Sequence, residues 1–380
     1  MVSELTIEKI VQGGAGLARL KDGRICFVQG ALPGEKVLAQ ITSQNKDFTR
    51  GKVLEVLVKS PDRVVPPCPL FGRCGGCSLQ HIKADRQTFY MEQIVRDNFL
   101  RMAKLDLPSD FVIHSGNPWN YRNRARVVRC GAKGFGFREQ DSNLVVPFKD
   151  CMVLTENLNH FLKEKACNIK AREINLFDNG QGKISWYYRG MNGKEFESNA
   201  LNVVEIGGRK ISMDASVFFQ SNLGLLPKLI CAVRQAAGQG EWLIDLFSGV
   251  GFFATLLQDN FKRITTVERD KFCLRHARAN LKGKDAEEIA LPAEDWLEKN
   301  VVEKKATLIV DPPRTGLPKT ALDAIAKSSV DRLIYVSCDP VTLARDYRIL
   351  AEHGFSLEHC EGFAFYPQTP HLEMLLVLCR

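Results

Sequence analysis

The sequence predicts an α/β fold in which a doubly wound, mainly parallel sheet follows a small all-β module and an α+β region. Three observations lead to this prediction. Short apolar, β-branched runs alternate with helical runs from residue 242 to the C-terminus, which is typical of a parallel sheet with helices on both faces. Glycine turns separate several short strand-like runs in residues 1–60. The chain has 380 residues, enough for two or three domains, and we place these at 1–60, 61–213 and 214–380.

The composition is that of a globular protein with a basic front part. Hydrophobic residues make up 45% and charged residues 25% of the chain. With no long apolar run and no signal peptide, we expect a cytoplasmic monomer without a membrane partner. The net charge of +8 arises within residues 1–130, which hold 20 Lys and Arg against 12 Asp and Glu. This excess favours a nucleic-acid partner, with ordinary solubilising charge as the alternative.

The first 60 residues predict a small β-barrel. Strand-like runs at 25–28, 36–41 and 52–57 are separated by glycine turns. Basic and aromatic side chains between Lys46 and Lys52 are typical of a nucleic-acid-binding face on such a barrel. A hairpin with a solvated basic rim is the alternative.

Three cysteines within ten residues follow the barrel, with the spacing C-x5-C-x2-C at Cys68, Cys74 and Cys77. Thiolates this close, with glycines between them, suit a soft-metal site. Cys151 is the best candidate for a fourth ligand and Cys130 is its rival. Four thiolates hold either zinc or an iron-sulfur cluster, and the spacing does not separate the two. A disulfide framework is not expected in a cytosolic chain.

An arginine-rich strand is expected after a helix at residues 80–102. Arg122, Arg124 and Arg126 alternate with neutral residues, so on a strand they would share one face. Three arginines on one face suit phosphate groups. A salt-bridged sheet face is the alternative.

The C-terminal part begins with a strand at residues 242–244 that runs into a glycine turn and a helix. This arrangement indicates a nucleotide-type cofactor loop, because glycines let the backbone approach a ligand closely. The next strand ends at Glu268, at the separation where an acidic residue takes a ribose diol.

Two further strands, 307–310 and 333–336, end at Asp311 and Cys338. Ligands of open parallel sheets sit beyond the carboxyl ends of the strands, so both side chains are expected at one crevice. Cys338 lies in a polar turn, which favours a reactive thiol over a buried apolar one. Glu373 begins the last strand and is a candidate general base.

The chain resembles the S-adenosylmethionine-dependent RNA 5-methyluridine methyltransferases over nearly its whole length, and in particular the 23S ribosomal RNA type. The resemblance rests on a TRAM-like start and on these motifs: C-x5-C-x2-C, YRNRARV, FFQSN, DLFSGVGFF, DPPR, SCDP and HLE. It implies a Rossmann-like class I methyltransferase domain, an N-terminal OB-like TRAM barrel and a central α+β iron-sulfur domain.

The same resemblance implies a role for individual residues. A [4Fe-4S] cluster is expected on four cysteines: Cys68, Cys74, Cys77 and Cys151. S-adenosyl-L-methionine contacts are expected at Gln220, Phe247, Gly249, Glu268 and Asp311. Cys338 would be the nucleophile and Glu373 the base. The sequence departs from the family pattern at Ser248 and Phe252, and the acidic contact after the third strand is open between Glu294 and Asp295.

The expected chemistry needs these residue types. A thiolate that adds to carbon 6 of uracil makes carbon 5 nucleophilic, and a base must later remove the carbon 5 proton. The target base must leave its stack, which favours a looped RNA. Phe218 or Phe219 would stack on it, and Arg122 and Arg124 would hold flanking phosphates.

Other functions would leave different signatures in the sequence. A 5-methylcytidine transferase would carry a Pro-Cys motif after the fourth strand, and a radical methylthiotransferase a C-x3-C-x2-C triplet, and neither is present. A non-catalytic RNA-binding module with structural zinc is the alternative from another class. Among substrates, 23S ribosomal RNA is expected first and the T loop of transfer RNA second.

Overall fold

The start of the chain is an all-β module, as the sequence predicts, and it is built on one six-stranded sheet. The computed structural model describes residues 1–131, 134–140, 142–190, 195–198 and 201–380. The strands of this first sheet pair in the order β1-β5-β6-β4-β3-β2, and their core holds small and branched apolar side chains. Their bounds are β1 Val2–Thr6, β2 Lys9–Ile10, β3 Gly16–Arg19, β4 Ile25–Gln29, β5 Lys36–Gln44 and β6 Phe48–Val58.

The middle of the chain forms a second six-stranded sheet, in the order β10-β9-β8-β11-β12-β13, and a separate hairpin of β14 and β15. One short helix and a 3-10 turn, α2 Glu156–Glu164 and η3 Ala166–Asn168, pack on the sheet. The strands are β8 Arg124–Arg129, β9 Phe135–Arg138, β10 Val145–Pro147, β11 Ala171–Asp178, β12 Ile184–Gly190, β13 Glu195–Ser198, β14 Leu201–Ile206 and β15 Arg209–Asp214.

The C-terminal part contains the doubly wound sheet that the sequence predicts. Its order is β18-β17-β16-β19-β20-β22-β21-β7, with β16 to β20 parallel and β22 antiparallel to its neighbours. The strands are β16 Gly240–Leu246, β17 Phe261–Val267, β18 Ala286–Ile289, β19 Ala306–Val310, β20 Arg332–Ser337, β21 Ser356–Phe363, β22 Glu373–Cys379 and β7 Val112–His114.

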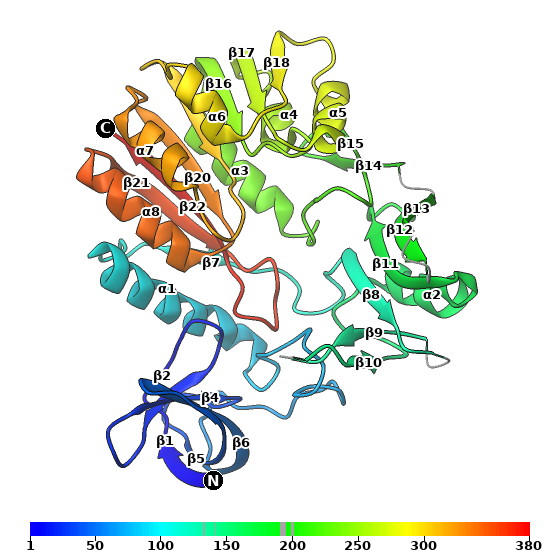
Figure 1. Ribbon diagram of the computed structural model, residues 1–380, viewed down its shortest axis with the longest axis vertical. Helices are drawn as coiled ribbons and strands as arrows, with labels where there is room; N and C mark the ends of the chain where they lie inside the picture. The colour runs from blue at the N-terminus through cyan, green and yellow to red at the C-terminus, as the bar shows by residue number, and fades with distance from the viewer. Residues whose placement is uncertain (132–133, 141, 191–194, 199–200) are drawn as a thin grey trace.

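Helices cover both faces of this sheet (Figure 1). One apolar core holds side chains of α3, α4 and α5, and the other holds side chains of α1, α6, α7 and α8. The helices are α1 Gln87–Ala103, preceded by η1 Ala84–Arg86, α3 Leu226–Ala237, α4 Phe252–Leu257, α5 Lys271–Asn280, α6 Ala293–Lys299, α7 Lys319–Lys327 and α8 Pro340–Glu352. None of the helices in the described ranges combines the length and the apolar character that crossing a membrane requires.

Two elements from the predicted middle range join the C-terminal layers. Strand β7 pairs in parallel with β21 at the edge of the large sheet. Helix α1 buries Tyr90, Ile94 and Phe99 in the core that also holds Leu343 of α8. The boundary at residue 213 stays a prediction, but the sheet takes in residues far before it. A three-residue edge strand has too few side chains to give a periodic signal.

Candidate active site

The pairing of the strands brings three predicted site residues, Cys338, Glu373 and Asp311, to the same end of the large sheet. Cys338 directly follows β20, and Ser337 pairs with Met374 of the antiparallel strand β22. Continuing that register by one residue places Cys338 opposite Glu373, and directly opposed residues have Cα atoms about 5 Å apart. Asp311 follows β19, the other neighbour of β20. Glu373 is only 6% exposed, whereas Asp311 and Cys338 are half-buried.

Burial makes this cluster of acidic groups hard to ionise. Burial raises the pKa of Cys338 to about 12, and the nearby Glu373 and Asp311 contribute to this rise. Burial raises the pKa of Asp311 to about 7. The pKa of Glu373 is raised well above its usual value, first by burial and then by Asp311. Near neutral pH the Cys338 thiol is therefore protonated, and the raised pKa of Glu373 favours its protonated form relative to an exposed glutamate.

Arg314 is a part of the site to which the sequence analysis assigns no role. Its side chain lowers the pKa of both Cys338 and Glu373, so it is the cation that favours their ionised forms. The signal that could have found it is its place in the DPPR motif, three residues after Asp311.

The glycine turn after β16 holds a conformation that suits close approach of a ligand. Phe247, Gly249 and Gly251 all have positive φ, at 59°, 53° and 72°, which is unusual for phenylalanine. Apart from Gly249 itself and its two neighbours in the chain, no described residue has an atom within 4 Å of where a Cβ on Gly249 would stand. The Gly249 amide donates to Glu268 Oε2 at 3.0 Å, and the Asp270 amide donates to Oε1 at 2.8 Å. The hydrogen bond from Gly249 thus holds the glycine turn against Glu268, whose carboxylate is the predicted ribose-binding group.

Asp245, near the end of β16, is a second residue that the sequence analysis missed. It is completely buried, and its Oδ2 accepts a hydrogen bond from the Ala254 amide at 3.1 Å. Burial raises its pKa to about 8. Its Oδ1 and the Ser248 hydroxyl are buried without a hydrogen-bond partner among the described residues. Unpaired buried polar atoms are costly, so this turn has the donors and acceptors of a ligand site.

Residues 216–222 contain two phenylalanines that were both expected to stack on RNA, and the structure distinguishes between them. Phe218 is 62% exposed, whereas Phe219 is 2% exposed. The Phe219 ring packs edge-on against Phe177 and Phe252, so it belongs to the core. Gln220 is buried beside them. Only Phe218 of the pair is available to a ligand.

Arg124 and Arg126 share one face of β8, as predicted, because they alternate with buried Ala125 and Val127, whereas Arg122 lies outside the strand. Strand β8 begins at Arg124, after Arg122, and the Arg122 guanidinium lies over the rings of Phe137 and Tyr366. Arg124 is partly buried and donates to the Ala215 carbonyl at 3.3 Å, and burial lowers its pKa to about 10. Arg126 pairs with Glu173 at 2.7 Å. The alternation of the sequence did not reveal that each arginine meets a different neighbour.

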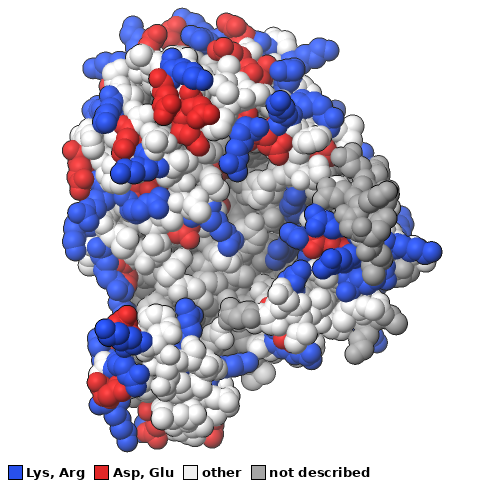
Figure 2. Space-filling model, viewed as in Figure 1, with Lys and Arg blue, Asp and Glu red and all other residues white. Residues whose placement is uncertain are grey.

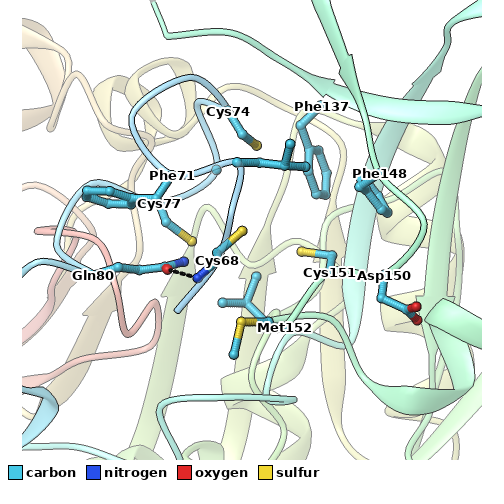
Figure 3. Close-up of a pocket in the computed structure, with 13 residues that line it drawn as sticks. Cys68, Phe71, Cys74, Cys77, Gln80, Phe137, Phe148, Asp150, Cys151 and Met152 are labelled. Atoms are coloured by element: carbon cyan, nitrogen blue, oxygen red, sulfur yellow. Dashed lines mark hydrogen bonds between the residues drawn. The ribbon is translucent and has the colours of Figure 1, made fainter. Parts of the chain in front are cut away.

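All four predicted cluster ligands line one pocket (Figure 3). Cys68, Cys74 and Cys77 come from the loop before η1, and Cys151 comes from the loop after β10. Cys130, the rival ligand, lies outside this pocket, with its Sγ 3.8 Å from the Val145 carbonyl oxygen. In the described ranges, no group of three or more His, Cys, Asp or Glu side chains is arranged to hold a metal ion.

The walls of this pocket are mostly apolar, and a glycine between two of its cysteines lies close to a neighbouring strand. Phe71, Phe137, Phe148 and Met152 line it beside the cysteines. A Cβ on Gly75 would stand 2.9 Å from the Arg138 carbonyl oxygen, which explains the glycine at that position. Burial raises the pKa of Cys74, Cys77 and Cys151 and brings that of Cys77 to about 12. Near neutral pH these thiols would therefore be protonated when no metal is bound to them.

Comparisons with known proteins agree with these features. The model of the tRNA (uracil-5-)-methyltransferase family matches residues 191–380, and that of the TRAM domain matches residues 2–54. The chain is 30% identical to an "uncharacterized RNA methyltransferase" of Thermotoga maritima, over 100% of this chain and 99% of the relative. It is 31% identical to the 23S rRNA (uracil(1939)-C(5))-methyltransferase RlmD of Shewanella amazonensis, over 97% of this chain and 94% of the relative.

A solved structure confirms the fold over the whole chain. The tRNA (uracil-54, C5)-methyltransferase of Pyrococcus abyssi, in complex with S-adenosyl-L-homocysteine, superposes with a TM-score of 0.76 at 22% identity. The match covers 99% of this chain and 100% of the other. The predicted class I methyltransferase fold with an N-terminal TRAM domain is therefore confirmed. The chain belongs to the tRNA (uracil-5-)-methyltransferase family and is an S-adenosylmethionine-dependent RNA (uracil-5-)-methyltransferase.

Proposed function

We propose that this enzyme methylates carbon 5 of one uridine in 23S ribosomal RNA, as a monomer in the cytoplasm. The observation that best supports this reaction is that Cys338, Glu373 and Asp311 lie together where neighbouring strands of the sheet end. Ribosomal RNA is favoured because the chain is similar to RlmD over nearly the full length of both. The T loop of transfer RNA is the second candidate, supported by the name of the Pyrococcus enzyme.

The residues around the glycine turn fit the cofactor. Unpaired oxygens at Asp245 and Ser248, the open face of Gly249 and the carboxylate of Glu268 together provide partners for a nucleoside with a charged amino-acid group. Gln220, Phe247 and Asp311 complete the set that would hold it. S-adenosylmethionine supplies an electrophilic methyl group there.

Protein side chains carry the other steps. The Cys338 Sγ forms a bond to carbon 6 of uracil, and the displaced electron pair makes carbon 5 nucleophilic. Arg314 favours the thiolate that this step needs. After methyl transfer, Glu373 takes the proton from carbon 5, the double bond re-forms and the Sγ–C6 bond breaks. A carboxylate with a raised pKa is a stronger base, which suits this role.

Several surfaces would hold the RNA. Lys and Arg side chains gather around the hollow between the three parts of the molecule (Figure 2). The TRAM domain adds Arg50, whose guanidinium lies over the Phe48 ring, and exposed Phe218 would stack on a base. Arg124, the first residue of β8, and Arg122, just before β8, would contact the RNA backbone. Neutralising several phosphates makes such binding strongly dependent on salt.

Mapping 5-methyluridine tests the proposal. Ribosomal and transfer RNA from cells with and without this gene would be digested and compared by mass spectrometry. We expect 5-methyluridine to disappear at one uridine of 23S ribosomal RNA. Loss only in transfer RNA would keep the chemistry and overturn the substrate. If no 5-methyluridine disappears from either pool, the proposed reaction is wrong.

We further propose that Cys68, Cys74, Cys77 and Cys151 hold a [4Fe-4S] cluster rather than zinc. The four cysteines line one pocket with mostly apolar walls, and four cysteine thiolates are the usual ligands of such clusters. The cluster would tie the loop before η1 to the loop after β10.

Protein purified without oxygen is expected to contain about four iron atoms and about four sulfide ions per chain. Cys77→Ala should lose most of this iron, whereas the matched variant Cys130→Ala should keep it, because Cys130 lies outside the pocket. Metal analysis and visible absorption measure both. A full complement of zinc without iron would contradict the cluster.

A further inference from the structure

Two exposed phenylalanines stand out on the surface beside the cofactor turn. Phe218 is 62% exposed and Phe272, in the first turn of α5, is 61% exposed. Burying a phenyl ring is favourable, so a ring left in water is a candidate for contact with a partner. The proposed chemistry uses Phe218 as a stacking surface, but it assigns nothing to Phe272.

The two rings arise from neighbouring backbone. Cys273 follows Phe272 in the chain, and its buried thiol lies against the backbone amide of Phe218. The Cys273 side chain therefore links the backbone at Phe272 to the backbone at Phe218. Because both side chains are exposed and arise from linked backbone, we place them on the same part of the surface.

Buried contacts hold this arrangement in place. Cys273, His276 and Asn280 are spaced three and four residues apart, so they share one face of α5. His276 Nε2 lies 3.1 Å from Asp214 Oδ2, at the end of β15. Asn280 Oδ1 accepts from the Ser212 amide at 2.7 Å. Helix α5 is thus hydrogen-bonded to Ser212 and Asp214 of β15, a few residues before Phe218, and Figure 1 shows α5 beside β15.

Asp214 connects helix α5 to the segment that contains Phe218. Its Oδ1 accepts from the Ser216 amide at 2.8 Å and from the Ser216 hydroxyl, while its Oδ2 faces His276. The hydrogen bonds from His276 and Ser216 hold the pKa of Asp214 well below its usual range, against the opposing effect of burial. Residues 216–222 therefore leave β15 in a direction that α5 sets.

The surface around the two rings is cationic. Arg269, Lys271 and Arg275 are exposed, and the first two make no ion pair within the part of the chain that the structure describes. Asp270 is the only acidic residue between 269 and 278, and its Oδ1 is occupied by the Phe272 amide at 2.8 Å. Exposed aromatic rings interleaved with cations are typical of surfaces that bind single-stranded nucleic acid.

We propose that Phe272 and Phe218 form a stacking platform for unpaired nucleotides that flank the target uridine, with Lys271 and Arg275 on their phosphates. The platform adjoins the glycine turn of the proposed cofactor site, because α5 begins three residues after Glu268, whose carboxylate accepts a hydrogen bond from the Gly249 amide. This inference rests on the proposed function, since it names further contacts to the same RNA.

Phe272→Ala tests the platform. Loss of one base-stacking contact is expected to weaken binding of unmethylated 23S ribosomal RNA, transcribed in vitro, by about 5- to 150-fold. KM for this RNA should rise by a similar factor, while kcat and the dissociation constant of S-adenosylhomocysteine stay unchanged. Phe272→Trp keeps an aromatic face and should bind the RNA within about threefold of wild type. Filter binding and steady-state methyl transfer provide these values.

A matched control removes a ring elsewhere. Phe89 of α1 is 40% exposed and lies under the Arg86 guanidinium, so Phe89→Ala loses an exposed phenyl group outside the platform and should bind the RNA like wild type. Equal RNA affinity of Phe272→Ala and wild type would overturn the platform. Equal weakening by Phe272→Trp would overturn stacking as its basis. Failure of the proposed substrate shows separately, as absence of methylation by the wild-type enzyme.

Discussion

Methyl transfer is expected to stop when Cys338 is replaced by alanine, with kcat/KM falling by at least about 10,000-fold. Without the thiol no bond forms at carbon 6, and carbon 5 of uracil stays too poor a nucleophile to take a methyl group. The dissociation constant of S-adenosylhomocysteine should stay within about twofold of wild type. Transfer of radiolabelled methyl groups to RNA and calorimetry measure the two effects.

The control for this variant is Cys231→Ala. Cys231 is an exposed cysteine on α3, so its loss should leave the rate unchanged. If Cys338→Ala keeps turnover near that of Cys231→Ala, Cys338 is not the nucleophile.

The reactivity of the Cys338 thiol should depend on pH in a defined direction. Burial raises its pKa to about 12, so alkylation of the ligand-free enzyme at pH 7 is expected to be slow. The thiolate fraction then grows about tenfold per pH unit. Ionisation of Asp311, whose pKa is about 7, adds a like charge and flattens this rise near neutral pH. Iodoacetamide labelling of Cys338, followed by mass spectrometry from about pH 6 to 10, measures the slope.

A covalent protein–RNA adduct is expected to accumulate when Glu373 is replaced by glutamine, with turnover reduced by about 100- to 10,000-fold. Glutamine keeps the size of the side chain but accepts no proton, so the methylated base stays bonded to Cys338. Denaturing gels should show the enzyme at a higher mass, and nuclease digestion followed by mass spectrometry should find a methylated uridine on Cys338.

Glu358→Gln provides the matched control on the neighbouring strand. Glu358 lies on β21 at the surface and pairs with Arg332 at 3.2 Å, so the variant should turn over normally without adduct. Rapid turnover of Glu373→Gln with no adduct would exclude Glu373 as the base.

The fold and the rim of the site follow from local patterns. Short β-branched runs that alternate with helices predict a parallel sheet, and polar residues directly after such runs must lie at its carboxyl edge. The positions of Asp311 and Cys338 in the chain are therefore enough to predict that they lie at one crevice. The dense cysteine triplet likewise identifies a loop that curls around one pocket.

Only the tertiary structure decided which of several equivalent residues are exposed at the surface. Phe218 and Phe219 are alike in sequence, but one is exposed and the other packs between Phe177 and Phe252. Strand β7 joins the sheet, and α5 reaches Phe218 through Cys273, a residue far from it in the chain. Periodicity reports the two faces of one element, whereas these outcomes depend on contacts between distant residues. The sequence by itself therefore determined the chemistry and the sheet that carries it, and packing between distant segments decided the surface presented to RNA.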